Sequence, residues 1–402
     1  MDAYLLEWAS LLLRWAHVIT AVAWIGASFY FVMLDNSLSA PEHDDLKAKG
    51  VDGEFWAVHG GGFYHSNKYM LAPRWLPLPQ NMHWSYWESY STWLTGFALF
   101  TVLYLFNAGN FLIDKTVYDW SATAAISTAL AFLAMFWIVY DAICRMLGER
   151  LGGDVWVGVA VLSTITFASW FACQLFAGRA AFLLVGAMIA TAMSANVFFW
   201  IIPGQRKVIA QLRAGAPVDP VHGRRGKQRS VHNTYFTLPV LIAMVSNHYG
   251  WLYQGTRNWL VLVFLMVAGA LIRHSFAARH KAQVLGRRTP WEHAVIGVAI
   301  LAGVAIWLAP QPPKTTASDS NEPISFSAVQ SVIEQRCVSC HNAAVQQKNV
   351  ALHTPALIRQ HAQNIYQQAA VLKVMPMNNA TQITDQERSL IKRWFEGGAK
   401  TN

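Results

Sequence analysis

The sequence predicts an all-α protein: a polytopic membrane helix bundle of about eight spans, followed by a small C-terminal helical domain. The first observation is composition, because the 402 residues are 54% hydrophobic and only 13% charged, about half the charged fraction of soluble domains. The second is pattern, because apolar stretches of about 20 residues, the length that crosses a bilayer, recur along residues 1–309. The 18 Trp residues favour the same class, since Trp gathers at membrane interfaces.

The expected spans lie at 9–32, 88–107, 122–143, 155–177, 180–202, 234–253, 258–277 and 292–309. On one side of them, the connecting loops hold seventeen Lys or Arg, whereas the opposite loops hold only Lys115, Arg179 and Arg257. Because positively charged loops stay in the cytoplasm, both termini are expected on the periplasmic face of a bacterial inner membrane. The net charge of +9 therefore reflects topology, and nucleic acid is not expected as a partner.

A tether and a soluble domain follow the last span. Residues 310–325 are rich in Pro, Ser and Thr, which is typical of an extended linker. Residues 326–402 form the expected soluble domain, with helices over 326–336 and 385–396. The second helix begins with a capping box and has one apolar face.

The soluble domain carries the motif CVSCH at residues 337–341, the pattern of covalent c-type haem attachment. The thiols of Cys337 and Cys340, one helical turn apart, can bond the two vinyl groups of one porphyrin, and His341 then reaches the iron. A zinc site is disfavoured, because it needs two further Cys or His at ligand spacing. The motif therefore predicts haem c, with His341 as the proximal iron ligand.

The sixth iron ligand is expected from Met375-Pro376-Met377, which precedes the last helix. Residues 324–400 resemble the small class I cytochromes c. In that family the distal methionine commonly precedes a proline, which selects Met375 and leaves Met377 as the alternative. Ligation by His and Met raises the haem potential, which suits an electron acceptor.

Ionisable residues inside the expected spans are the other functional candidates, because such groups are energetically expensive in a membrane. His17 lies in the outer third of the first span, and His248 lies at the same depth in the sixth. His232, Arg273 and His274 fall at the cytoplasmic ends of the sixth and seventh spans. Hydrogen bonding between helices and interfacial anchoring are the alternative, structural roles.

The chain resembles the membrane-bound bacterial urate hydroxylases in WAVHGGGFYHSNKYMLAP, NMHWSYWESYSTWLTGF, SVHNTYFTLPVLIAMVSNHYGW and LIRHSFAARH, followed by the CVSCH domain. This resemblance implies oxidation of urate to 5-hydroxyisourate, with electrons passing to the fused cytochrome c and on to a respiratory acceptor. It does not imply the peroxide-producing reaction of soluble urate oxidases. The first span also resembles the opening helix of membrane haem proteins related to protoporphyrinogen oxidase, whose corresponding histidine binds haem b. That likeness points to His17.

Urate is a planar anion, so its site should offer aromatic faces, a cation and a general base. Arg273 is the expected cation, His232 or His274 the expected base, and water the expected oxygen source. A cytoplasmic site would need an electron relay across a hydrocarbon core about 30 Å thick. A haem b between His17 and His248 would serve as that relay. A periplasmic site would need no relay, and the same two histidines would then be candidates to bind urate.

Two other functional classes are compatible with the sequence. One is a membrane oxidoreductase that acts on a quinol or a porphyrinogen. The other is a transporter or channel whose cytochrome domain only senses the redox state. Adding urate, a quinol or a porphyrinogen to oxidised membranes and following haem c reduction distinguishes them.

Replacing Cys337 and Cys340 together by Ala is expected to abolish covalent haem but not membrane insertion. Insertion depends on the apolar spans, whereas the small C-terminal domain depends on its haem for a core. Haem staining of the denatured protein and membrane fractionation measure the two effects. Covalent haem that survives the double substitution would refute the assignment.

Overall fold

The computed structural model describes residues 2–70, 73, 77–148, 153–253, 255–309, 324–343, 346 and 350–401. Almost all of the expected linker at 310–325 lies outside these residues, so its extended conformation stays a prediction.

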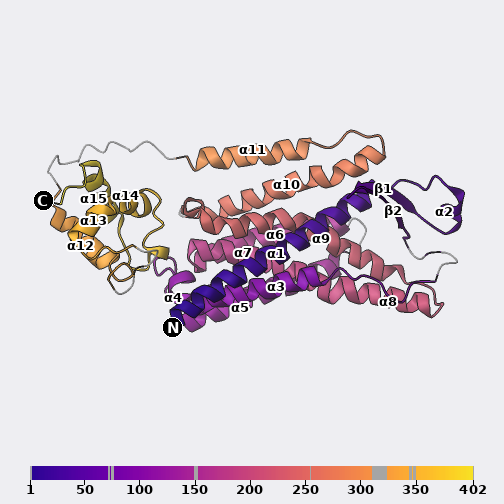
Figure 1. The fold of residues 1–402 in the computed structure, drawn as a ribbon, viewed down its shortest axis with the longest axis horizontal. Coiled ribbons are helices and arrows are strands. Elements are labelled where there is room, and N and C mark those ends of the chain that lie inside the picture. The colour runs from indigo at the N-terminus through magenta and orange to yellow at the C-terminus, as the bar shows by residue number, and fades with distance from the viewer. Residues whose placement is uncertain are drawn as a thin grey trace.

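Long helices lying side by side make up the N-terminal part of the chain (Figure 1). These helices are α1 (Asp2–Ser37), α3 (Trp87–Phe100), α5 (Ala122–Leu147), α6 (Gly153–Leu175), α7 (Gly178–Ala195), α9 (Pro220–Val245), α10 (Asn258–Val284) and α11 (Glu292–Trp307). Shorter elements complete this bundle: α2 (Asp44–Ala48), η1 (Thr101–Leu105), α4 (Ala108–Phe111), η2 (Asn196–Ile201), α8 (Ile202–Arg213), η3 (Ser246–His248) and η4 (Gly250–Leu252). Each expected span overlaps one of the long helices.

Among the described residues, five helical stretches are long and apolar enough to cross a membrane. They are Tyr4–Ser37, Ala122–Leu147, Gly153–Leu175, Gly178–Arg213 and Asn258–Val284. The apolar helix α11 has 16 residues, which is short for a span. The total of eight spans therefore stays a prediction.

Helix α9 begins fourteen residues before the expected span at 234–253. Its first turn is fixed by Asp219, whose carboxylate accepts from the Val221 amide at 2.9 Å, and by Pro220 at the first helical position. The basic segment between the expected spans at 180–202 and 234–253 is therefore mostly helical, within α8 and α9.

A β-hairpin departs from the all-α prediction. Strands β1 (Gly53–His59) and β2 (Gly62–Lys68) pair antiparallel, with His59 opposite Gly62. Gly60 and Gly61 form the two-residue turn with φ of 61° and 80°, a conformation that favours glycine. The glycine pair is therefore a hairpin signal in the segment between the expected spans at 9–32 and 88–107.

Residues 324–401 form a second helical body, here called the C-terminal unit. Its elements are α12 (Phe326–Arg336), α13 (Pro355–Gln360), α14 (Ala362–Ile365), η6 (Tyr366–Val371), η7 (Met377–Asn379) and α15 (Asp385–Glu396). Helices α12 and α15 have the predicted bounds. The predicted capping box is also confirmed, because Thr384 and Glu387 each accept a hydrogen bond from the other's backbone amide, at 3.2 and 2.7 Å. Ile333 and Ile391 are fully buried in a core separate from that of the bundle.

The two ends of the bundle differ. The N-terminus and the C-terminal unit lie at one end, and the hairpin lies at the other (Figure 1). The chain thus ends on the side of the bundle where it begins, as two termini on one membrane face require.

Candidate functional site

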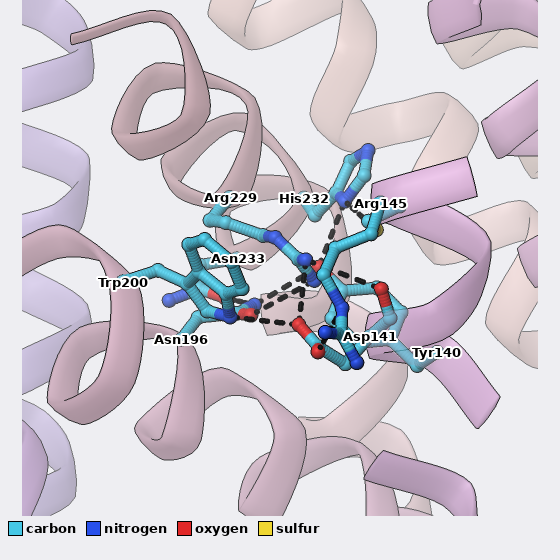
Figure 2. Close-up of polar contacts among 9 residues, drawn as sticks. Tyr140, Asp141, Arg145, Asn196, Trp200, Arg229, His232 and Asn233 are labelled. Atoms are coloured by element: carbon cyan, nitrogen blue, oxygen red, sulfur yellow. Dashed lines mark hydrogen bonds and ion pairs between the residues drawn. The ribbon is translucent and has the colours of Figure 1, made fainter. Parts of the chain in front are cut away.

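A network of polar side chains is buried where α5, η2 and α9 meet (Figure 2). At its centre, one oxygen of Asp141 accepts hydrogen bonds from Arg229 Nη2 and from Trp200 Nε1, both at 2.7 Å. The other oxygen pairs with Arg145 Nε at 2.9 Å. Asp141 and Arg229 are only 4% and 2% exposed, so each neutralises a charge that would otherwise be buried alone. We call this set the Asp141 network.

His232 belongs to the Asp141 network. Its Nδ1 lies 2.8 Å from the hydroxyl of Tyr140. The Asn196 amide donates to that hydroxyl and to the Asn233 side-chain oxygen, both at 2.9 Å. Asn196 and Trp200 both lie in the π-helical turn η2, a type of turn that is frequent at functional sites. The network ties three elements together and places His232 inside it.

A second group, the Arg273 cluster, lies around α10, where that helix packs against α1, α9 and α11. The Arg273 guanidinium stacks over the Phe29 ring, 3.9 Å from its centroid. Arg273 is 6% exposed, yet its Nε and Nη2 have no hydrogen-bond partner among the described residues. These two nitrogens form one edge of the guanidinium. The edge can hold a planar anion with two parallel hydrogen bonds.

Three side chains of the Arg273 cluster can move a proton. The Nδ1 atom of His274 lies 2.7 Å from the Tyr235 hydroxyl. The ring centroids of His274 and His293 are 4.4 Å apart. His293 Nδ1 is buried and, like the Arg273 edge, has no hydrogen-bond partner in the described part of the chain. A buried cation beside two imidazoles and a phenol is suited to binding an ionised ring and accepting its protons.

The structure brings together some of the predicted site residues. Arg273 and His274 are consecutive residues of α10, whereas His232 lies in the Asp141 network. No hydrogen bond or ion pair among the described residues joins His232 to Arg273 or His274. Asp141 was missed in the sequence, although an acid within an apolar span is itself a signal. Tyr235 was also missed, because its contact with His274 joins separate helices.

The two histidines predicted to bind haem b are in different settings. His17 Nδ1 lies 3.1 Å from the Thr92 carbonyl oxygen and 3.2 Å from Thr95 Oγ1, which joins α1 to α3. Its ring packs so closely on Gly96 that a Cβ there would lie 2.7 Å from Cε1. His248 is exposed in η3, and the described residues show no contact between it and His17. Haem b ligation therefore stays a prediction, and the described contacts show His17 bonded between helices.

The C-terminal motif fits a covalently attached haem. Cys337 and Cys340 are free thiols just after α12, and burial raises the pKa of Cys337 to about 11. His341 Nδ1 lies 3.0 Å from the Val350 carbonyl oxygen. Since that contact takes the Nδ1 hydrogen, Nε2 is left to bind iron. Met375, the predicted distal ligand, lies half-buried between η6 and η7.

Removing one partner of the Asp141–Arg229 pair would leave the charge of the other partner buried and unpaired. Asp141→Leu is therefore expected to lower the free energy of unfolding by about 3–5 kcal/mol. Thermal unfolding in detergent measures this change. The double variant Asp141→Leu/Arg229→Leu should lose less free energy of unfolding than the sum of the losses of the two single variants.

Arg145 is the matched control, because it pairs with the same carboxylate but its side chain is 60% exposed. Arg145→Ala should lower the free energy of unfolding by at most about 1 kcal/mol. Equal losses for Asp141→Leu and Arg145→Ala would show that the network does not depend on its buried pair.

Comparison with known proteins gives one family. The family model described as urate oxidase N-terminal matches residues 3–309, which is most of the chain. No curated protein and no solved structure matches. The match includes both the Asp141 network and the Arg273 cluster. The chain therefore belongs to the urate oxidase N-terminal family.

Proposed function

We propose that this protein is a membrane-bound enzyme that oxidises urate to 5-hydroxyisourate and passes the electrons to a haem c in its C-terminal unit. In the balanced reaction, a urate anion and one water yield 5-hydroxyisourate, one proton and two electrons. Family membership supports oxidation of urate, and the five apolar helices support a membrane location. The Arg273 cluster is the observation that carries the proposal.

Arg273 would bind the urate anion. A guanidinium buried without an anion carries a desolvation penalty of several kcal/mol, so its position is explained by a ligand that supplies negative charge. The unpaired Nε and Nη2 donors form a flat edge that matches adjacent oxygen and nitrogen atoms of an ionised purine. The bound anion would neutralise the cation and satisfy both donors.

His274 would be the general base. In the tautomer with hydrogen on Nδ1, it donates to the Tyr235 hydroxyl at 2.7 Å and keeps a lone pair on Nε2. That lone pair would take a proton from the water whose oxygen bonds to urate C5. His293, next to His274, would pass protons on toward Glu292 at the start of α11.

Haem c would be held by Cys337, Cys340, His341 and Met375. When bound, it supplies one-electron redox chemistry at a raised potential. Because one haem accepts one electron, urate would reduce it twice, with a respiratory acceptor removing an electron in between. Arg388 keeps the Met375 segment on α15 by donating to the Met375 carbonyl oxygen at 2.8 Å.

Substitution of Arg273 tests the substrate site. Arg273→Gln is expected to raise the KM for urate by about ten- to a hundredfold, because a charge-assisted hydrogen bond to an anion contributes about 1.5–3 kcal/mol. His274→Ala is expected to lower kcat by about 10²–10⁴ with a smaller change in KM. Steady-state urate consumption measures both constants.

Arg279→Gln is the control, because Arg279 is exposed on the same helix. It should leave KM and kcat unchanged.

Without urate, Arg273→Gln should also unfold at a higher temperature than the wild type, since it removes a buried unpaired charge. An unchanged KM in Arg273→Gln would rule out the Arg273 cluster as the urate site.

A further inference from the structure

We propose that Arg179 docks the C-terminal unit onto the bundle through Met377, and that Met375 is thereby left as the methionine for the haem iron. The part that concerns iron rests on the proposed function, whereas the docking contact does not. The two methionines of Met375-Pro376-Met377 would thus have separate roles.

Arg179 is held at the end of the bundle by three elements. It lies in the first turn of α7, and its Nε donates to the Asn247 side-chain oxygen at 3.2 Å. The Tyr104 hydroxyl donates to the same oxygen at 2.9 Å. On its other side, the guanidinium lies 5.5 Å from the centroid of the Phe111 ring in α4. These contacts within the bundle are enough to fix the guanidinium, so its position does not depend on the C-terminal unit.

The remaining contact of Arg179 reaches the C-terminal unit. Its Nη1 donates to the sulfur of Met377 at 3.7 Å. Beside this contact, α4 packs against η7, which begins at Met377. Arg179 is one of three basic residues in the loops expected to face outward, so its charge is available where the C-terminal unit lies (Figure 1).

The segment that carries both methionines is also fixed from within the C-terminal unit. Arg388, 7% exposed, donates to the carbonyl oxygens of Ala369 and Met375, and its Nη2 donates to the Asn379 side-chain oxygen at 3.5 Å. Arg388 thus holds residues 375–379 on α15, while Arg179 holds them on the bundle.

This arrangement separates the two candidate iron ligands. The sulfur of Met377 accepts a hydrogen bond from the bundle, whereas the described residues show no hydrogen bond to the sulfur of Met375. An electron that leaves the bundle would reach ferric haem c beside the docking contact and reduce it to the ferrous state. Arg179 is therefore a positioning residue, because it acts through Met377 and touches neither substrate nor iron.

The docking contact is tested by oxidation of methionine. The full-length haem-loaded protein is treated with chloramine-T, and the sulfoxide at Met377 is followed by mass spectrometry against the exposed Met70. Arg179→Ala is expected to speed oxidation of Met377 several-fold, and Arg179→Lys less. Arg257→Ala, which removes an exposed arginine from the neighbouring outer loop, should change nothing.

The electron-transfer part is tested in the same variants. Urate-driven reduction of haem c should slow several-fold in Arg179→Ala and in Met377→Leu, while reduction by ascorbate stays unchanged. Met375→Leu should abolish the methionine–iron charge-transfer absorption, which Met377→Leu should retain.

Unchanged oxidation of Met377 in Arg179→Ala would overturn the docking contact. Loss of the absorption band in Met377→Leu but not in Met375→Leu would overturn the division of roles. If urate fails to reduce haem c even in the wild type, the proposed function is wrong. The rates of Met377 oxidation in the wild type and in Arg179→Ala still test the docking contact in that case.

Discussion

A cation enclosed by apolar helices needs a counter-charge or acceptor atoms, and this constraint distinguishes the three arginines that are buried among the described residues. Arg229 meets it with the carboxylate of Asp141, and Arg388 meets it with carbonyl oxygens of its own unit. Arg273 is as deeply buried, yet two of its nitrogens have no partner among the described residues. The first two arginines therefore hold the fold, whereas the third is the one that, in the proposed function, would bind the urate anion.

The proposed urate site and the C-terminal unit occupy different levels of the bundle. Arg273 lies fifteen residues after Asn258, the first residue of α10, which corresponds to about 22 Å along the helix axis. Asn258 is close to Gly178, beside the docking residue Arg179. Electrons from urate would therefore have to travel along the bundle before they reach the docking contact. A haem b between His17 and His248 would carry electrons over part of this distance. The contacts of the two histidines do not by themselves support that haem.

Local signals made the best predictions, and contacts between distant segments the poorest. The capping box at Thr384 predicted the start of α15, and the apolar stretches predicted the positions of the long helices. The hairpin was missed although its Gly60-Gly61 turn is a local signal, because the whole segment between the first two expected spans was interpreted as a loop. The Asp141 network was missed because its central pair joins residues 88 positions apart, which no local pattern encodes. Arg273 was chosen as a candidate from the sequence because a charge within an apolar span stands out on its own.

In the proposed function, electrons from urate leave through the C-terminal unit. Anaerobic mixing of urate with the purified, oxidised protein tests it most directly, with haem c followed by absorbance and urate by chromatography. With ferricyanide present to take the first electron from haem c, each urate consumed is expected to deliver two electrons through haem c, without oxygen and without peroxide. Haem c that stays oxidised, while urate is consumed only when oxygen is admitted and peroxide accumulates, would contradict it.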